Sequence, residues 1–237
     1  MYNKKMWTAT GCLSDHRQVF VNLPRILGAY VGPNAIEPNL NESVMVTVNS
    51  ENNCPFCEGL HGELARMAGV EEVSSLMNAD SLKTCQQISD KQAIAYARVF
   101  AENNGREQNE ANAFQALISK EGPGRAKSIR ALCWFLLWGS LGGNTIIGFL
   151  KRFQGKGRRD SNLLFEMVFT IYYGPLFLLI AIVNALLQFF PKVPSWFSAF
   201  FGVVLTFIAA IWIIPLGLIS VLIPSKPKVL GRLSTSV

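Results

Sequence analysis

Charged residues are scarce in this sequence. They make up 16% of the 237 residues, against about 25% in an average soluble domain. The shortage is concentrated after residue 160, where 77 residues hold four basic residues and one acidic residue. Residues 1–124 hold 10 Lys and Arg against 14 Asp and Glu, whereas residues 125–160 hold 8 against 1. The net charge of +6 therefore flanks apolar segments, which argues against nucleic-acid binding and fits a strip that faces anionic lipid headgroups.

Cysteine and histidine are also few. The five cysteines are an odd number and only Cys54 and Cys57 are close together, so the pattern does not fit a disulfide-stapled secreted domain. Cys12, Cys85 and Cys133 have neither a paired thiol nor a nearby base, and we expect them to be structural. No apolar stretch of signal-peptide length opens the chain, which argues against a cleaved secretion signal.

The alternation of apolar and polar residues that marks a strand is missing from residues 17–121 over any useful length. Apolar residues recur there at helical spacing. Asn41 suits the N-cap of one helix, and Pro55 suits the first turn of the next, where its missing N–H group is not needed. The sequence therefore predicts an all-α domain. Its expected helices cover residues 17–31, 42–51, 54–69, 90–103 and 109–120.

Residues 131–150 form a run of 20 residues without a charge, long enough to span a bilayer by length alone. The run contains Gly139, Gly142 and Gly143, and basic residues lie on both sides of it. Basic flanks at both ends argue against a crossing, because each end then prefers the cytoplasmic side. A membrane span and a core helix that closes the soluble domain both stay open, and we favour the core helix.

Two later segments are long enough to span a membrane. Residues 168–190 and 196–223 are free of charge over 23 and 28 residues, and each exceeds the roughly 20 residues that a spanning helix needs. The short turn between them predicts a helical hairpin over 163–223, followed by a basic polar tail at 224–237. Basic clusters lie just before and just after the hairpin. We therefore expect a two-pass integral membrane protein whose soluble domain and tail lie on the cytoplasmic side, or on the equivalent side of an organelle membrane.

Residues 54–61 read Cys-Pro-Phe-Cys-Glu-Gly-Leu-His and carry the chemistry of the sequence. On a helix, Cys57 and His61 lie one turn apart on the same face, and Cys54 lies one turn before Cys57. A helix N-terminus stabilises a thiolate and lowers its pKa, and His61 can accept the thiol proton as a general base. The segment therefore predicts a redox-active cysteine pair, in a compartment where thiols can be re-reduced.

Other interpretations of this segment have less support. Structural zinc needs four ligands, usually as two separated pairs, and His16 is the only histidine outside the segment. Covalent haem attachment needs a histidine directly after the second cysteine, where Glu58 stands. A pair of core cysteines beside a satisfied core histidine stays open as the non-catalytic interpretation.

The sequence around the pair resembles the alkyl hydroperoxidase D-like branch of the carboxymuconolactone decarboxylase superfamily. Glu42, Cys54, Cys57 and His61 fit the pattern Glu-x11-Cys-x2-Cys-x3-His of that branch, and the flanking text is similar over about residues 15–155. The resemblance implies an all-helical bundle that forms homo-oligomers and closes with a core helix packed on the catalytic helix. The apolar segments after residue 160 are an addition that typical soluble members lack.

The resemblance also assigns roles by matching position. Cys57 is the attacking thiol and Cys54 its disulfide partner, while His61 transfers the proton and Glu42 orients His61 or balances its charge. No bound cofactor or metal is implied, and an external dithiol supplies the electrons. Phe56 stands where some members carry another histidine, a departure that weakens the case for full peroxidase efficiency.

We therefore expect a redox domain at 1–155, a basic juxtamembrane linker at 156–162, the membrane hairpin at 163–223 and the polar tail at 224–237. The expected function is a membrane-anchored, thiol-dependent hydroperoxide reductase or disulfide oxidoreductase in antioxidant defence. Its partners would be a hydroperoxide or a protein disulfide, a thiol reductant and membrane lipid, with no nucleic acid. The alternative is a non-catalytic accessory subunit of a larger membrane complex, built on the same fold.

Overall fold

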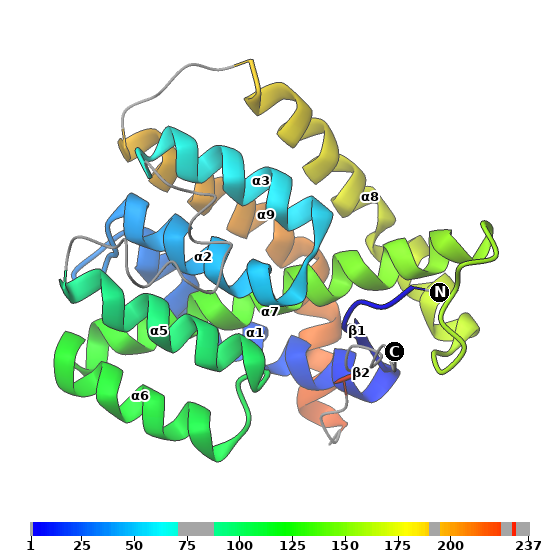
Figure 1. The fold of residues 1–237 in the computed structure, drawn as a ribbon, viewed down its shortest axis with the longest axis horizontal. Helices are drawn as coiled ribbons and strands as arrows, with labels where there is room; N and C mark the ends of the chain where they lie inside the picture. The colour runs from blue at the N-terminus through cyan, green and yellow to red at the C-terminus, as the bar shows by residue number, and fades with distance from the viewer. Residues whose placement is uncertain (1, 71–87, 190–194, 224–228, 231–237) are drawn as a thin grey trace, which may run out of the picture.

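The structure is a computed structural model of the chain, and it describes residues 2–70, 88–189, 195–223 and 229–230. Apart from two short strands, the regular structure of these residues is helical (Figure 1), which confirms the all-α class predicted from the sequence. The helices are α1 (Ala9–Tyr30), α2 (Pro38–Asn52), α3 (Pro55–Met67), α5 (Ile88–Glu102), α6 (Gln108–Glu121), α7 (Pro123–Arg152), α8 (Leu163–Leu187) and α9 (Ser195–Leu222).

Two helices begin earlier than the sequence predicts. α1 begins at Ala9 because the side chain of Thr8 accepts a hydrogen bond from the N–H group of Gly11 and caps the helix. α2 begins at Pro38, whose fixed φ angle suits the first turn. The prediction of Asn41 as an N-cap is therefore wrong, since Asn41 lies inside α2 and is buried.

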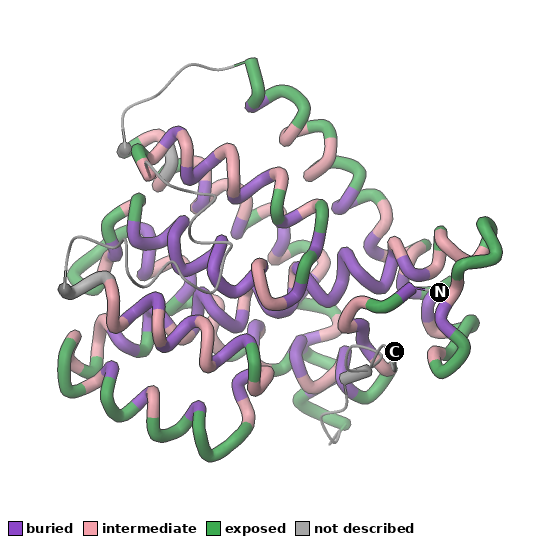
Figure 2. Tube along the Cα trace, in the orientation of Figure 1, coloured by how far each residue is buried: buried purple, intermediate pink, exposed green. Residues whose placement is uncertain are grey.

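α7 is the central helix of the bundle and packs against α1, α2, α3, α5, α6 and α8. Its most apolar 18-residue stretch is 78% buried within the protein, and Figure 2 shows buried residues along most of its length. This burial fits the core-helix interpretation of residues 131–150. Glycine allows close packing there, because a Cβ atom at Gly143 would lie 2.5 Å from the sulfur of Cys54.

α8 and α9 are the most apolar helices. Together with α7 they make three helices, within the described residues, that are long and apolar enough to cross a membrane. The sequence predicts two membrane spans and favours a core helix for the third segment. The corresponding stretches of α8 and α9 are only 22% and 28% buried. The two helices contact each other through hydrogen bonds of Tyr172 and Tyr173 with Trp212. α8 packs more extensively against α3 and α7, and α9 packs along α1 (Figure 1). Both helices are therefore integral to the bundle.

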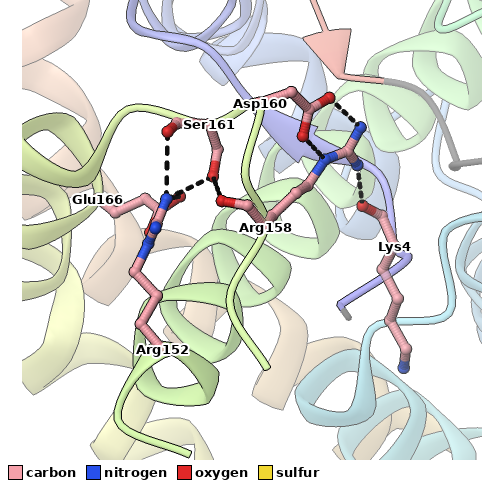
Figure 3. A network of polar contacts seen from close by, with 6 residues as sticks. All are labelled: Lys4, Arg152, Arg158, Asp160, Ser161 and Glu166. Carbon is pink, nitrogen blue, oxygen red and sulfur yellow. Dashed lines mark hydrogen bonds and ion pairs between the residues drawn. The ribbon is translucent and has the colours of Figure 1, made fainter. Parts of the chain in front are cut away.

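Charged side chains fix the connection between α7 and α8 (Figure 3). Arg152 donates hydrogen bonds to both carboxylate oxygens of Glu166 at 2.6 and 3.1 Å. Arg158 is buried, and its guanidinium group donates to Asp160 at 2.7 and 2.9 Å and to the carbonyl oxygen of Lys4 at 2.8 Å. Arg158 was predicted to lie in a basic linker that faces lipid headgroups, but the contacts described here are with groups of the protein itself.

A short antiparallel pairing joins the two ends of the chain. β1 (Met6–Trp7) pairs with β2 (Val229–Leu230), with Met6 opposite Leu230. β2 lies within the segment that the sequence analysis expected to be a polar tail. The chain beyond α9 therefore returns to the segment that precedes α1.

Candidate functional site

The turn between α2 and α3 positions the cysteine pair. Asn53 ends α2 in the left-handed conformation, with a φ angle of 54°, which asparagine tolerates better than most residues. Cys54 then forms the N-cap of α3, and Pro55 follows as its first residue. The side-chain amide of Asn49 accepts from the N–H group of Cys54 and donates to its carbonyl oxygen, both at 3.2 Å. Cys54 is thereby held at the N-terminus of α3.

The two thiols are free and differ in their electrostatics. Burial opposes ionisation of Cys54, but hydrogen bonds from the Cys57 thiol and from the N–H groups of Cys57 and Phe56, with the charge of Lys4, hold its pKa below the ordinary value. The hydrogen bond to Cys54 and then burial raise the pKa of Cys57 well above its ordinary value. Ionisation of Cys54 is therefore favoured over ionisation of Cys57.

The two cysteines also differ in exposure: Cys54 has the lowered pKa, but Cys57 is the more exposed. Cys54 is 0% exposed, whereas Cys57 is 7% exposed. Cys57 lines a cavity together with His61, and Cys54 does not. Access from outside therefore favours Cys57, the residue to which the family resemblance assigns the attack.

Glu42 and His61 meet between α2 and α3. The Nδ1 atom of His61 lies 2.9 Å from Oε2 of Glu42, and both side chains are buried. A carboxylate at Nδ1 selects the tautomer that carries its proton there, which leaves Nε2 as a proton acceptor. The structure thus brings the four predicted residues together as two contacting pairs, Glu42 with His61 and Cys54 with Cys57.

The cavity beside Cys57 and His61 is narrow and almost entirely apolar, with a volume of about 60 Å³. A single water needs about 10–15 Å³, so the cavity has room for a few small groups such as a hydroperoxide. Two of the apolar helices supply much of its wall: Leu176, Phe177 and Ile180 from α8, and Gly202, Leu205 and Ala209 from α9. Sequence reasoning missed this contribution, because an apolar side chain that faces a cavity has the same composition as one that faces lipid.

The other cysteines differ from the sequence-based expectation in one respect. The sulfur of Cys12 lies 3.4 Å from Nδ1 of His16, so the prediction that Cys12 has no nearby base is wrong. The spacing of four residues between them was the available signal, and it equals the spacing of Cys57 and His61. Cys12 is buried and does not line the cavity beside Cys57, and burial raises its pKa, which favours the protonated thiol. Cys133 is buried, and Cys85 lies outside the described residues.

No group of three or more His, Cys, Asp or Glu side chains in the described part of the chain is placed to hold a metal ion. No protein-family model, curated protein or solved structure matches this chain. Support for a function therefore comes from the motif, from the geometry of its side chains and from the cavity beside them.

Proposed function

We propose that this protein is a membrane-anchored, thiol-dependent hydroperoxide reductase of the alkyl hydroperoxidase D-like type, acting on a hydroperoxide with an apolar body. The observation that carries the proposal is the cavity in which Cys57 and His61 meet apolar side chains of α8 and α9. A thiol and a proton acceptor share one small apolar space there. Such a space admits the hydroperoxide group and excludes bulk water.

The proposed reaction uses both cysteines. His61 accepts the proton of Cys57, and the Cys57 thiolate attacks the terminal oxygen of R–O–O–H. The S–O bond forms, the O–O bond breaks, and the alkoxide takes a proton and leaves as the alcohol R–OH. Sulfur loses two electrons, the peroxide gains them, and Cys57 becomes a sulfenic acid.

The lowered pKa of Cys54 suits the second step. The Cys54 thiolate attacks the sulfenic sulfur of Cys57, the disulfide forms, and the hydroxyl group leaves as water after taking a proton. An external dithiol then reduces the Cys54–Cys57 disulfide by two thiol–disulfide exchanges. In this scheme the lowered pKa of Cys54 favours its role as the resolving thiol, while the contact of Cys57 with the cavity favours its role as the peroxidatic one.

Burial of the pair favours a hydroperoxide over a protein disulfide as the substrate. Cys54 is 0% exposed and Cys57 is 7% exposed. The disulfide of a folded partner protein could not reach sulfur atoms that are buried to this extent. A small apolar molecule needs only the cavity. The apolar outer faces of α8 and α9 support a location in a membrane, where apolar hydroperoxides concentrate.

The test uses the full chain purified in detergent and treated with an organic hydroperoxide and dithiothreitol. We expect hydroperoxide consumption by the wild type, and mass spectrometry should find a Cys54–Cys57 disulfide when dithiothreitol is left out. Cys57→Ser should abolish consumption, and Cys54→Ser should accumulate a sulfenic acid at Cys57 that reacts with dimedone. Cys12→Ser is the matched control, because it removes another buried thiol beside a histidine.

Equal hydroperoxide consumption by the wild type and Cys57→Ser would rule the proposal out. Absence of turnover with every hydroperoxide, together with co-purification in fixed stoichiometry with other membrane subunits, would favour the accessory-subunit alternative.

A further inference from the structure

A second cavity, of about 290 Å³, lies between α1, α6, α7 and the turn that joins α5 to α6. It shares no lining residue with the cavity beside Cys57. Four cationic side chains and two amides line it: Arg25, Arg106, Lys127, Arg130, Gln18 and Asn22. None of its lining residues is acidic, so the cavity presents donors and positive charge without a negative group of its own.

Two of the guanidinium groups form ion pairs with buried carboxylates. Arg106 forms an ion pair with Asp15, and Arg130 forms one with Glu110 at 2.9 Å. The indole N–H group of Trp7 donates to the other oxygen of Asp15 at 2.7 Å. These contacts fix the two arginine side chains before any ligand arrives.

The same guanidinium groups also lie over aromatic rings that line the cavity. Arg106 lies 5.2 Å from the centre of a Trp134 ring, and Arg130 lies 4.5 Å from the centre of the Phe114 ring. Planar guanidinium groups held in this way present their remaining N–H donors in a fixed direction, as recognition of a planar or tetrahedral oxyanion requires.

The charge of the cavity is not balanced by protein groups. Asp15 and Glu110 neutralise Arg106 and Arg130, while among the described residues no ion pair involves Arg25 or Lys127. Two positive charges therefore remain. In addition, Nε of Arg130 is buried with no hydrogen-bond partner in the described structure, and a buried donor without an acceptor is destabilising.

We infer that this cavity binds a phosphate monoester group. Such a group carries a charge of about −1.5 to −2 at neutral pH, which matches the two unbalanced positive charges. Its oxygens accept from several donors at once, and the four cationic side chains and the amide of Gln18 that line the cavity supply them. The group could come from a soluble metabolite or from the headgroup of a phosphatidic-acid-type lipid. The site is independent of the cysteine pair.

The test measures binding to the full chain in detergent. Inorganic phosphate and glycerol 3-phosphate are titrated by calorimetry, with sodium chloride at matched ionic strength as the reference. Phosphatidic acid and phosphatidylcholine are compared by native mass spectrometry. Arg25→Gln combined with Lys127→Gln should weaken binding at least about tenfold, the loss expected for charge-assisted hydrogen bonds. Both side chains are exposed, so the thermal midpoint without ligand should stay at the wild-type value.

Arg17→Gln is the matched control, because it removes an exposed cation of α1 that does not line the cavity. Saturable binding of glycerol 3-phosphate that the double variant weakens and Arg17→Gln preserves would support a soluble ligand. The same pattern with phosphatidic acid alone would support a lipid headgroup. Binding of neither probe, or binding that the double variant and Arg17→Gln weaken equally, would overturn the inference.

Discussion

At the scale of single residues, a substitution at Gly139 can narrow the cavity beside Cys57 without disturbing the packing of other side chains. Gly139 lines the cavity, and a Cβ atom added there would lie 3.7 Å from the sulfur of Cys57, an ordinary contact distance. No other side chain lies within 4 Å of that position. Alanine in a helix interior is more stable than glycine by about 1 kcal/mol.

We therefore predict that Gly139→Ala keeps or raises the thermal midpoint and slows the reaction of Cys57 with a bulky hydroperoxide more than its reaction with hydrogen peroxide. Stopped-flow kinetics with both oxidants measures the ratio of the two rates. Gly143→Ala, one turn further along α7, is the contrasting variant and should lower stability, because its Cβ atom would meet the sulfur of Cys54 at 2.5 Å. If Gly139→Ala slowed both oxidants by the same factor, the cavity would not be the route to Cys57.

The two cysteine–histidine pairs show how far residue-level reasoning from the sequence extends. Cys12 with His16 and Cys57 with His61 have the same spacing, and helix geometry places both pairs on one face. The spacing does not distinguish them. The surroundings do, since Cys57 lies at the start of α3 beside Cys54 and a cavity, whereas Cys12 is enclosed by the core.

At the scale of secondary-structure elements, the ion pair between Arg152 and Glu166 joins the end of α7 to the first turn of α8. Glu166 is buried and both its carboxylate oxygens accept from Arg152. Removing one member of a buried pair leaves an uncompensated charge, which is more destabilising than losing an exposed pair. The start of α8 therefore depends on a residue of the preceding helix.

We predict that Arg152→Gln lowers the free energy of unfolding in detergent by about 3 kcal/mol. Lys151→Gln is the control, since Lys151 donates to Gln154 at the surface and its loss should change stability by less than about 0.5 kcal/mol. Chemical unfolding followed by circular dichroism measures both variants. Equal losses in the two variants would show that the contact with Glu166 does not hold α8 in place.

Some helix boundaries were predictable from the sequence, and others were missed even where a local signal sets them, as Thr8 does for α1 and Pro38 for α2. The proline-initiated start of α3 was expected from the sequence and is observed. The early start of α1 was missed, because the segment after Thr8 has too few apolar residues to show a helical period. Thr8 caps this segment, and α1 as a whole packs against α7 and α9. A period test has no access to such contacts.

At the scale of the whole molecule, His16 lies where α1, α7 and α8 meet. The indole of Trp138 donates to its Nε2 atom at 2.9 Å, the hydroxyl group of Tyr173 contacts the same atom, and Nδ1 donates to the carbonyl oxygen of Cys12 at 2.6 Å. Burial lowers the pKa of His16 to about 4, although the hydrogen bond with Cys12 opposes this shift. The folded protein therefore holds His16 neutral.

The pH dependence follows from linkage. Between pH 6.5 and 4 the unfolded chain binds a proton at His16 that the folded chain does not bind, so stability is full above pH 6.5 and falls as the pH falls toward 4. The loss should reach about 3 kcal/mol at pH 4. Thermal unfolding of wild type and His16→Gln across this range isolates the contribution, because the variant lacks the titrating group. Parallel pH profiles for the two proteins would contradict the prediction.

Exposed apolar side chains and the cationic cavity lie on different parts of the molecule. Large apolar side chains are exposed along α8 and α9, among them Ile171, Ile182, Phe207 and Ile211. These faces fit contact with lipid, whereas the cavity lined by four cations lies between α1, α6 and α7. The proposed hydroperoxide site and the inferred phosphate site are thus formed by different sets of helices, with α1 and α7 contributing to both.

The sequence by itself determined what depends on neighbouring residues. Apolar period and proline position predict the helical class, the length of apolar runs identifies helices able to cross a membrane, and helix geometry places Cys54, Cys57 and His61 within two turns. These features are local, and a local pattern records them.

Only the tertiary structure decided which cysteine has the lowered pKa, which helices enclose the cavity, and how α8 and α9 pack. Each of these depends on residues far apart in the chain: Lys4 near Cys54, Leu205 of α9 near Cys57, and α1 along α9. Contacts between residues far apart in the chain leave no periodic or compositional pattern in the sequence. An apolar side chain buried against a cavity and one exposed to lipid are the same letter in the sequence, and they differ only in what surrounds them.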